Sequence, residues 1–288
     1  MKSFRRILKR TWVSIRHSKN ATIGFYFLVI IVAIAILAPL LAPYDPLEMN
    51  VGTKLLAPSS EYIMGTDMYG RDVLSRVLAG TSVSLSVGLL VVVLSMLIGV
   101  PLGLFAGFIG GWVDNIIMRF TDLLLCFPWV LVALCIAAIT GPGMPVVILA
   151  LVIAYVPTFI RLMQGMVLSV REKEYVEAAV VTGEKRQAII WRYIFPNCIA
   201  PLIVEATLIM SFVILSEAAI SYLGVGIQPP TPSWGTMLSE SMTYLWPAPY
   251  LAIFPGIAII ATVLAVNIFG DGLRDILDPR YMGGLRDE

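Results

Sequence analysis

Charged side chains are scarce in this chain of 288 residues, where Asp, Glu, Lys and Arg together make up only 14%. Hydrophobic residues make up 58%, and the mean hydropathy is +0.88. A typical soluble domain carries about 25% charged residues. The shortage of charge therefore excludes a water-soluble globule and indicates a membrane protein, in which lipid solvates much of the surface.

Residues that bind metals or carry out catalysis are also few. The chain has one histidine, His17, and three cysteines, Cys126, Cys135 and Cys198, all three in apolar stretches. Because no paired Cys and His spacing exists, we expect no metal bound by this chain. Nine residues separate Cys126 from Cys135, which would place them on opposite faces of one helix. No nucleophile stands in a pattern with a nearby base, so we expect a non-catalytic protein.

A phosphate-binding loop of the form G-x-x-x-x-G-K-[ST] is missing, and the sequence contains no Gly-Lys dipeptide. In proteins that have this loop, its backbone amides and its lysine bind the phosphates of ATP. We therefore expect no cofactor on this chain and assign any ATP and Mg²⁺ to other subunits.

Long uncharged runs are plentiful, and they predict the membrane spans. The first run is longer than the apolar region of a signal peptide, and Pro39 and Pro43 do not fit a cleavage site, so we interpret it as a retained anchor. Proline and glycine between Thr140 and Pro145 break the long run 123–160 into two spans. The predicted fold is all-α, with six transmembrane helices at residues 21–42, 84–108, two within 123–160, 199–223 and 250–270.

The positive charges predict the orientation of these spans. Of the 20 Lys and Arg residues, 17 lie in residues 1–20, 110–120, 161–195 and 271–288, which the six spans place on one side of the membrane. Because cytoplasmic loops are enriched in Lys and Arg, both termini are predicted to be cytoplasmic.

Polar and small residues within the spans suggest roles in packing or transport. Gly99, Gly103 and Gly107 repeat at every fourth position, which favours close helix packing. Glu205 and Glu217 are costly in lipid, so each either lines a pathway or makes a structural hydrogen bond. Asp122, Arg161 and Asn267 lie near predicted span ends, where solvation or helix pairing is expected rather than substrate contact.

A segment in the long cytoplasmic connection carries the most specific pattern. Its key residues are Glu177, Ala178, Ala179, Gly183 and Pro196. The alanines allow close approach of a partner, and the glycine can adopt the positive φ that ends a helix. The pattern resembles the EAA loop of ABC importer permeases, which docks on the ATPase subunit. This resemblance implies a coupling role for the matching segment, including Glu174, Tyr175 and Arg186, although Glu184, Tyr193 and Phe195 depart from the common pattern.

Four further segments narrow the resemblance to permeases of the dipeptide, oligopeptide and nickel importers, specifically the C-type member of the permease pair. They cover 65–76 (GTDMYGRDVLSR), 110–114 (GGWVD), 224–234 (GVGIQPPTPSW) and 270–279 (GDGLRDILDP). The resemblance implies an ABC importer permease fold and a peptide substrate. Its implied partners are a second homologous permease, two ATP-binding-cassette ATPases and an extracytoplasmic substrate-binding protein, with no nucleic acid.

On this basis we divide the chain into three parts and place it in the bacterial or archaeal plasma (inner) membrane. Residues 1–81 comprise a cytoplasmic segment, the first helix and an external loop, 82–273 form a five-helix core with the coupling loop at 169–196, and 274–288 form a cytoplasmic tail. External residues 43–81 either receive substrate or cap the pore. Two functional alternatives are a nickel-chelate or glutathione importer of the same family and a proton-coupled secondary transporter, against which the EAA loop argues.

Overall fold

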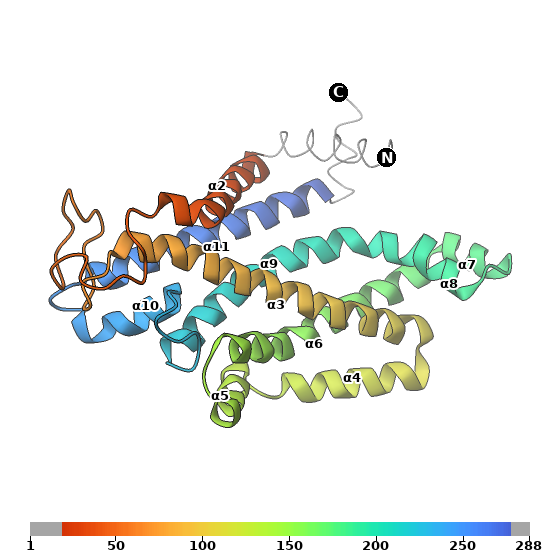
Figure 1. Ribbon diagram of the computed structural model, residues 1–288. Coiled ribbons are helices and arrows are strands. Elements are labelled where there is room, and N and C mark those ends of the chain that lie inside the picture. The colour runs from red at the N-terminus through yellow and green to blue at the C-terminus, as the bar shows by residue number, and fades with distance from the viewer. Residues whose placement is uncertain (1–18, 278–288) are drawn as a thin grey trace.

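The computed structural model describes residues 19–277, and these fold into helices and connecting loops (Figure 1). Within this range the only β pairing is an isolated bridge between Thr66 and Asp72. The cytoplasmic segment predicted before Lys19 and the tail after Leu277 lie outside the described residues. The all-helical prediction is confirmed.

Helices α2 (Lys19–Leu41) and α11 (Tyr250–Leu277) lie side by side and run in opposite directions (Figure 1). Their contact is close because glycines remove the side chains from it. A Cβ atom at Gly24 would meet the backbone of Phe269, and one at Gly272 would meet that of Ala21. The start of α2 and the end of α11 therefore share one end of the molecule. Most large apolar side chains of α2 are exposed, as expected for a helix in lipid.

Helix α3 (Val73–Ile109) begins at Val73, well before the expected start near Ser84. Asp72 caps it, because its carboxylate accepts a hydrogen bond from the Ser75 amide at 2.8 Å. Arg76 had been interpreted as lying in the external loop, but this arginine is buried within the helix and paired with acids. The boundary proposed between residues 81 and 82 thus falls inside one continuous helix.

Helix α6 (Met144–Arg171) is the main partner of α3. The three glycines spaced at every fourth residue face it, as the sequence predicted. Cβ atoms there would approach Phe159, Met163 and Val167 of α6 to 2.7–2.8 Å. The buried side chains of both helices form the centre of the largest apolar cluster, which includes Val91, Val156 and Phe159.

The long uncharged run 123–160 is broken twice, and the prediction of one break was incomplete. The expected break is present, since α5 (Trp129–Thr140) ends at Thr140 and α6 begins at Met144. A second break at Cys126–Pro128 separates α4 (Gly111–Leu125) from α5, and the two helices are bent by 81°. Pro128 explains it, because proline cannot continue a helix interior. Cys126 and Cys135 therefore do not share a helix.

Five helices of the described chain are long and apolar enough to cross a membrane, and the bent pair α4–α5 supplies a sixth crossing if it is counted as one span. The twelve residues of α5 extend only about 18 Å, short of the roughly 30 Å hydrocarbon thickness.

The connection after α6 folds into α7 (Glu174–Val181), α8 (Arg186–Ile189) and a π-helical turn (Ile190–Ile194), which leads into α9 (Phe195–Tyr222). Helix α10 (Trp234–Ser241) and a 3-10 turn (Met242–Tyr244) connect α9 to α11. In Figure 1 the α7–α8 segment and α10 lie at opposite ends of the molecule.

Candidate functional site: the α7–α8 segment and the opposite end

The segment 172–196 projects from the helical body at one end (Figure 1), and α7 attaches to that body by one face. Val176 and Ala179 are buried, whereas Glu174, Glu177 and Ala178 are exposed. The two alanines therefore differ in role: Ala179 packs within the chain, and only Ala178 is open to a partner. Apolar side chains at the free surface are Tyr175, Val180, Val181 and Trp191.

A glycine-dependent turn ends α7. Gly183 has φ of +79°, the conformation expected of this residue from the sequence. Its N–H donates to the Val180 carbonyl at 3.0 Å, and the N–H of Glu184 donates to the Ala179 carbonyl at 3.1 Å. These two bonds define a Schellman motif, which satisfies carbonyls that the helix end leaves open. The turn fixes the direction in which α8 leaves α7.

Two residues that depart from the common family pattern contact each other after this turn. The Glu184 carboxylate accepts a hydrogen bond from the Tyr193 hydroxyl at 3.3 Å and pairs with Arg192 at 3.4 Å. Glu184 and Tyr193 therefore connect the turn to the π-helical segment before α9. Two other predicted residues, Arg186 and Pro196, are exposed on the same segment.

The two membrane glutamates have different environments. Glu217 in α9 is fully buried, and its carboxylate accepts hydrogen bonds from Ser84 of α3 at 3.1 Å and from Ser221 at 2.9 Å. These contacts fit the prediction that Glu217 makes structural hydrogen bonds rather than lining a pathway. Glu205 is partly exposed and has no side-chain hydrogen bond or ion pair among the described residues. The structure does not bring the two glutamates together, since twelve residues of helix separate them by about 18 Å.

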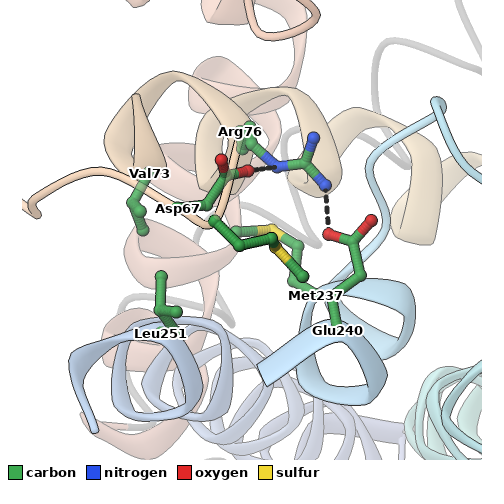
Figure 2. A pocket seen from close by; sticks show the side chains of 7 residues that line it. Asp67, Val73, Arg76, Met237, Glu240 and Leu251 are labelled. Carbon is green, nitrogen blue, oxygen red and sulfur yellow. Dashed lines mark hydrogen bonds and ion pairs between the residues drawn. The ribbon is translucent and has the colours of Figure 1, made fainter. Parts of the chain in front are cut away.

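Four charged residues, Asp67, Arg71, Arg76 and Glu240, form a largely buried group at the opposite end of the molecule. Figure 2 shows three of them, Asp67, Arg76 and Glu240. Arg71 binds Asp67 at 2.6 Å and Glu240 at 3.2 Å, and Arg76 binds Glu240 at 2.8 Å and Asp67 at 3.5 Å. The network ties the external loop and the start of α3 to α10. No local sequence pattern marks Glu240, which lies between the predicted spans 199–223 and 250–270. The one available signal was that this connection and residues 43–81, which contain Arg71 and Arg76, are predicted to lie on the same side of the membrane.

Further contacts hold the external loops around this network. The Trp234 indole donates to the Val77 carbonyl at 3.2 Å, and the Tyr250 hydroxyl donates to the Thr66 carbonyl at 2.9 Å. Burial raises the pKa of the Tyr62 phenol, which stays a neutral donor to the Val51 carbonyl at 2.7 Å. The segment 224–234 therefore contacts α3 through Trp234 and Val77, one residue beyond the segment 65–76, and the segment 65–76 contacts the start of α11 through Thr66 and Tyr250.

Comparison with protein families decides the class of this chain. The family model described as binding-protein-dependent transport system inner membrane component matches residues 99–283. The chain belongs to this family of transport components. A second model, the N-terminal TM domain of oligopeptide transport permease C, matches residues 7–58 of this family member.

Curated relatives resemble this inner membrane component over almost their whole length. A dipeptide transport system permease protein of Escherichia coli (strain K12) is 47% identical, covering 95% of this chain and 93% of the relative. One from Alkalihalophilus pseudofirmus is 42% identical, covering 94% and 90%. A di/tripeptide permease of Pseudomonas aeruginosa is also 42% identical, covering 95% and 92%.

A solved structure shows the same fold. A chain of the MetNI methionine ABC transporter in inward facing conformations matches with a TM-score of 0.60 at 14% identity, covering 70% of this chain and 96% of that one. The predicted ABC importer permease fold is confirmed, and so is the function as a permease subunit of such an importer. As an inner membrane component with several apolar helices, the chain is a multi-pass membrane protein.

Proposed function

We propose that this permease subunit forms half of a translocation pathway for dipeptides or oligopeptides, with a second homologous permease forming the other half. The proposal rests on relatives named as dipeptide permeases at 42–47% identity over nearly the whole chain. Two ATPase subunits and a substrate-binding protein complete the transporter. Hydrolysis of ATP belongs to those ATPases, and this chain is the non-catalytic, moving part.

The α7–α8 segment is the proposed contact with an ATPase. It offers an exposed apolar surface at Tyr175, Val180 and Val181 beside the carboxylates of Glu174 and Glu177. Apolar side chains that project beyond the helical body are suited to a protein partner. The Schellman turn at Gly183 is the rigid connection by which movement of the ATPase reaches α9.

The proposed orientation places this segment in the cytoplasm. Arg171 at the end of α6 donates to the carbonyls of Gly107 and Phe108 at 3.3 Å, so the ends of α3 and α6 lie together. Helix α2 runs antiparallel to α11 and also to α3. Ser82 of α3 donates to the Ala35 carbonyl, and Tyr44, three residues after α2, donates its N–H to the Ser75 hydroxyl oxygen at 3.1 Å. Residues 19 and 277 therefore lie toward the same end as the coupling segment, which supports cytoplasmic termini.

A matched pair of alanine substitutions tests the coupling contact. Ala178→Leu enlarges an exposed residue of α7, and Ala57→Leu makes the same change in an exposed part of the external loop. We expect A178L to weaken co-purification of the ATPases and to lower transport-coupled ATP hydrolysis at least about tenfold, because a close contact cannot absorb the added volume. A57L should leave both unchanged. Equal behaviour of the two variants would refute the docking assignment.

The substrate is tested by uptake in the reconstituted transporter with its binding protein. Labelled dipeptide should accumulate in an ATP-dependent manner, and neither a nickel chelate nor glutathione should compete at equal concentration. Uptake driven by a proton gradient without ATP would overturn the importer assignment itself.

A further inference from the structure

Two oppositely charged side chains meet on the surface of α4 and α6, both of which belong to candidate membrane spans. Arg161 of α6 binds Asp122 of α4 at 2.5 Å, with 52% and 48% of the two side chains exposed. Asp122 lies eleven residues after the start of α4, and Arg161 lies ten before the end of α6. Both are therefore about 15 Å from the same end of the molecule. They are paired with each other, and Arg161 lies inside α6 whereas Asp122 lies three residues before the end of α4.

The broken backbone between α4 and α5 lies one turn beyond Asp122. Cys126 and Phe127 of this break are exposed on the chain. Within a bilayer, irregular backbone is tolerated only where protein buries it or where it lines a water-filled cavity. Charged side chains within a bilayer likewise face protein or a water-filled cavity, because hydrocarbon does not solvate them. In secondary transporters, interrupted helices near the bilayer midplane commonly form the substrate site.

We propose that the Asp122–Arg161 pair faces the water-filled translocation pathway and contacts the charged ends of the peptide in transit. Arg161 would bind the peptide carboxylate and Asp122 the peptide ammonium, an inference that rests on the proposed peptide substrate. The guanidinium has five N–H donors. Its only described partner is one carboxylate oxygen of Asp122, so donors remain for a ligand. A small zwitterion supplies both complementary charges, whereas the acyl chains of lipid supply neither.

The first test uses the native thiol at the break. In the assembled transporter, a charged, membrane-impermeant thiosulfonate reagent is applied, and the modified cysteine is identified by peptide mass spectrometry. Cys126 should react at least about tenfold faster than the buried Cys198, because the reactive thiolate forms in water and not in lipid or in an apolar protein interior. Saturating dipeptide should slow the reaction. Protection of Cys126 in both the nucleotide-free and the vanadate-trapped transporter would place the pair against lipid or a partner and overturn the proposal.

The second test separates peptide contact from helix pairing. Asp122→Asn and Arg161→Gln should each lower dipeptide uptake at subsaturating peptide by about tenfold or more, the effect of losing one charge-assisted hydrogen bond. The exchanged pair, Asp122→Arg with Arg161→Asp, restores attraction between α4 and α6 but reverses the charges that the peptide meets. It should restore complex assembly and ATPase activity without restoring uptake. Full recovery of uptake would show a purely structural pair.

The controls distinguish failure of this inference from failure of the proposed function. Glu48→Gln removes an exposed carboxylate in the external loop and should leave uptake unchanged. If the unmodified transporter imports dipeptide and both single variants import it equally well, the pair has no pathway role. If the unmodified transporter imports no dipeptide at all, the proposed substrate is wrong, and the peptide contact falls with it, whatever the reactivity of Cys126.

Discussion

Single residues set the shape of the coupling segment, and only some of them are visible in the sequence. A glycine that ends a short helix has one conformation that other residues avoid, so the positive φ of Gly183 could be predicted from its position alone. The contact of Glu184 with Tyr193 could not, because it depends on the path of the π-helical turn between them. The role of this segment in coupling remains a prediction.

Gly183→Ala is expected to strain this turn. No atom lies within 4 Å of the position that its Cβ would take, so the effect comes from the left-handed backbone conformation alone, about 1–2 kcal/mol. We expect reduced transport-coupled ATP hydrolysis in the assembled complex, whereas Gly183→Asn, which tolerates positive φ, should retain most of it.

Gly165→Ala is the matched control, since Gly165 lies inside helix α6 and a Cβ there also meets nothing within 4 Å. This variant should be neutral or more stable by about 0.5–1 kcal/mol. If G165A reduced coupling as much as G183A does, the special conformation at Gly183 would not be the cause.

At the scale of helices, the sequence predicts which segments are helical but places two helix boundaries wrongly, each for a physical reason. The predicted start of α3 is too late because residues 43–81, which include Arg76, are predicted to form an external loop. In the structure Arg76 lies inside the helix, where Asp67 and Glu240 neutralise its charge. The break before α5 is not predicted because Pro128 lies within a long uncharged run, which by itself indicates a continuous span. Charge and length locate spans, but long-range ion pairs and single prolines alter their ends.

The packing of α3 on α6 predicts a large effect of adding one methyl group. Gly103→Ala would place a Cβ 2.8 Å from that of Met163 and also against the α6 backbone, so the helices must separate. Overpacking of this kind costs about 1–3 kcal/mol. Thermal unfolding of the purified subunit complex in detergent should show a lower Tm.

Gly256→Ala is the control for Gly103→Ala. It adds the same methyl group in helix α11, at a position where a Cβ meets no atom within 4 Å. Its Tm should stay unchanged or rise slightly. A normal Tm for G103A would mean that α3 and α6 are less closely packed than their glycine contacts indicate.

At the scale of the whole molecule, the two ends differ in construction. The end that carries α7 and α8 exposes apolar and charged side chains on a projecting segment, as expected for the proposed contact with an ATPase. The opposite end is closed by a buried ion network that joins residues far apart in the sequence, such as Arg71 and Glu240. The family motif 65–76 marked this end, but only the fold reveals that it binds α10.

The buried network should therefore hold the external loop to α10. Glu240→Gln leaves two buried arginines with reduced charge compensation, and breaking a buried ion pair by removing one partner costs about 3–5 kcal/mol. We expect a lower Tm and faster proteolysis within residues 43–72. Arg76→Met should also destabilise, because Glu240 loses its 2.8 Å partner and keeps only the 3.2 Å contact with Arg71. The double variant R76M/E240Q should be less destabilised than the sum of the single variants, by about 1–2 kcal/mol, because their direct contact is already lost. Strict additivity would instead indicate that the two side chains contribute independently and that the network does not act as one unit.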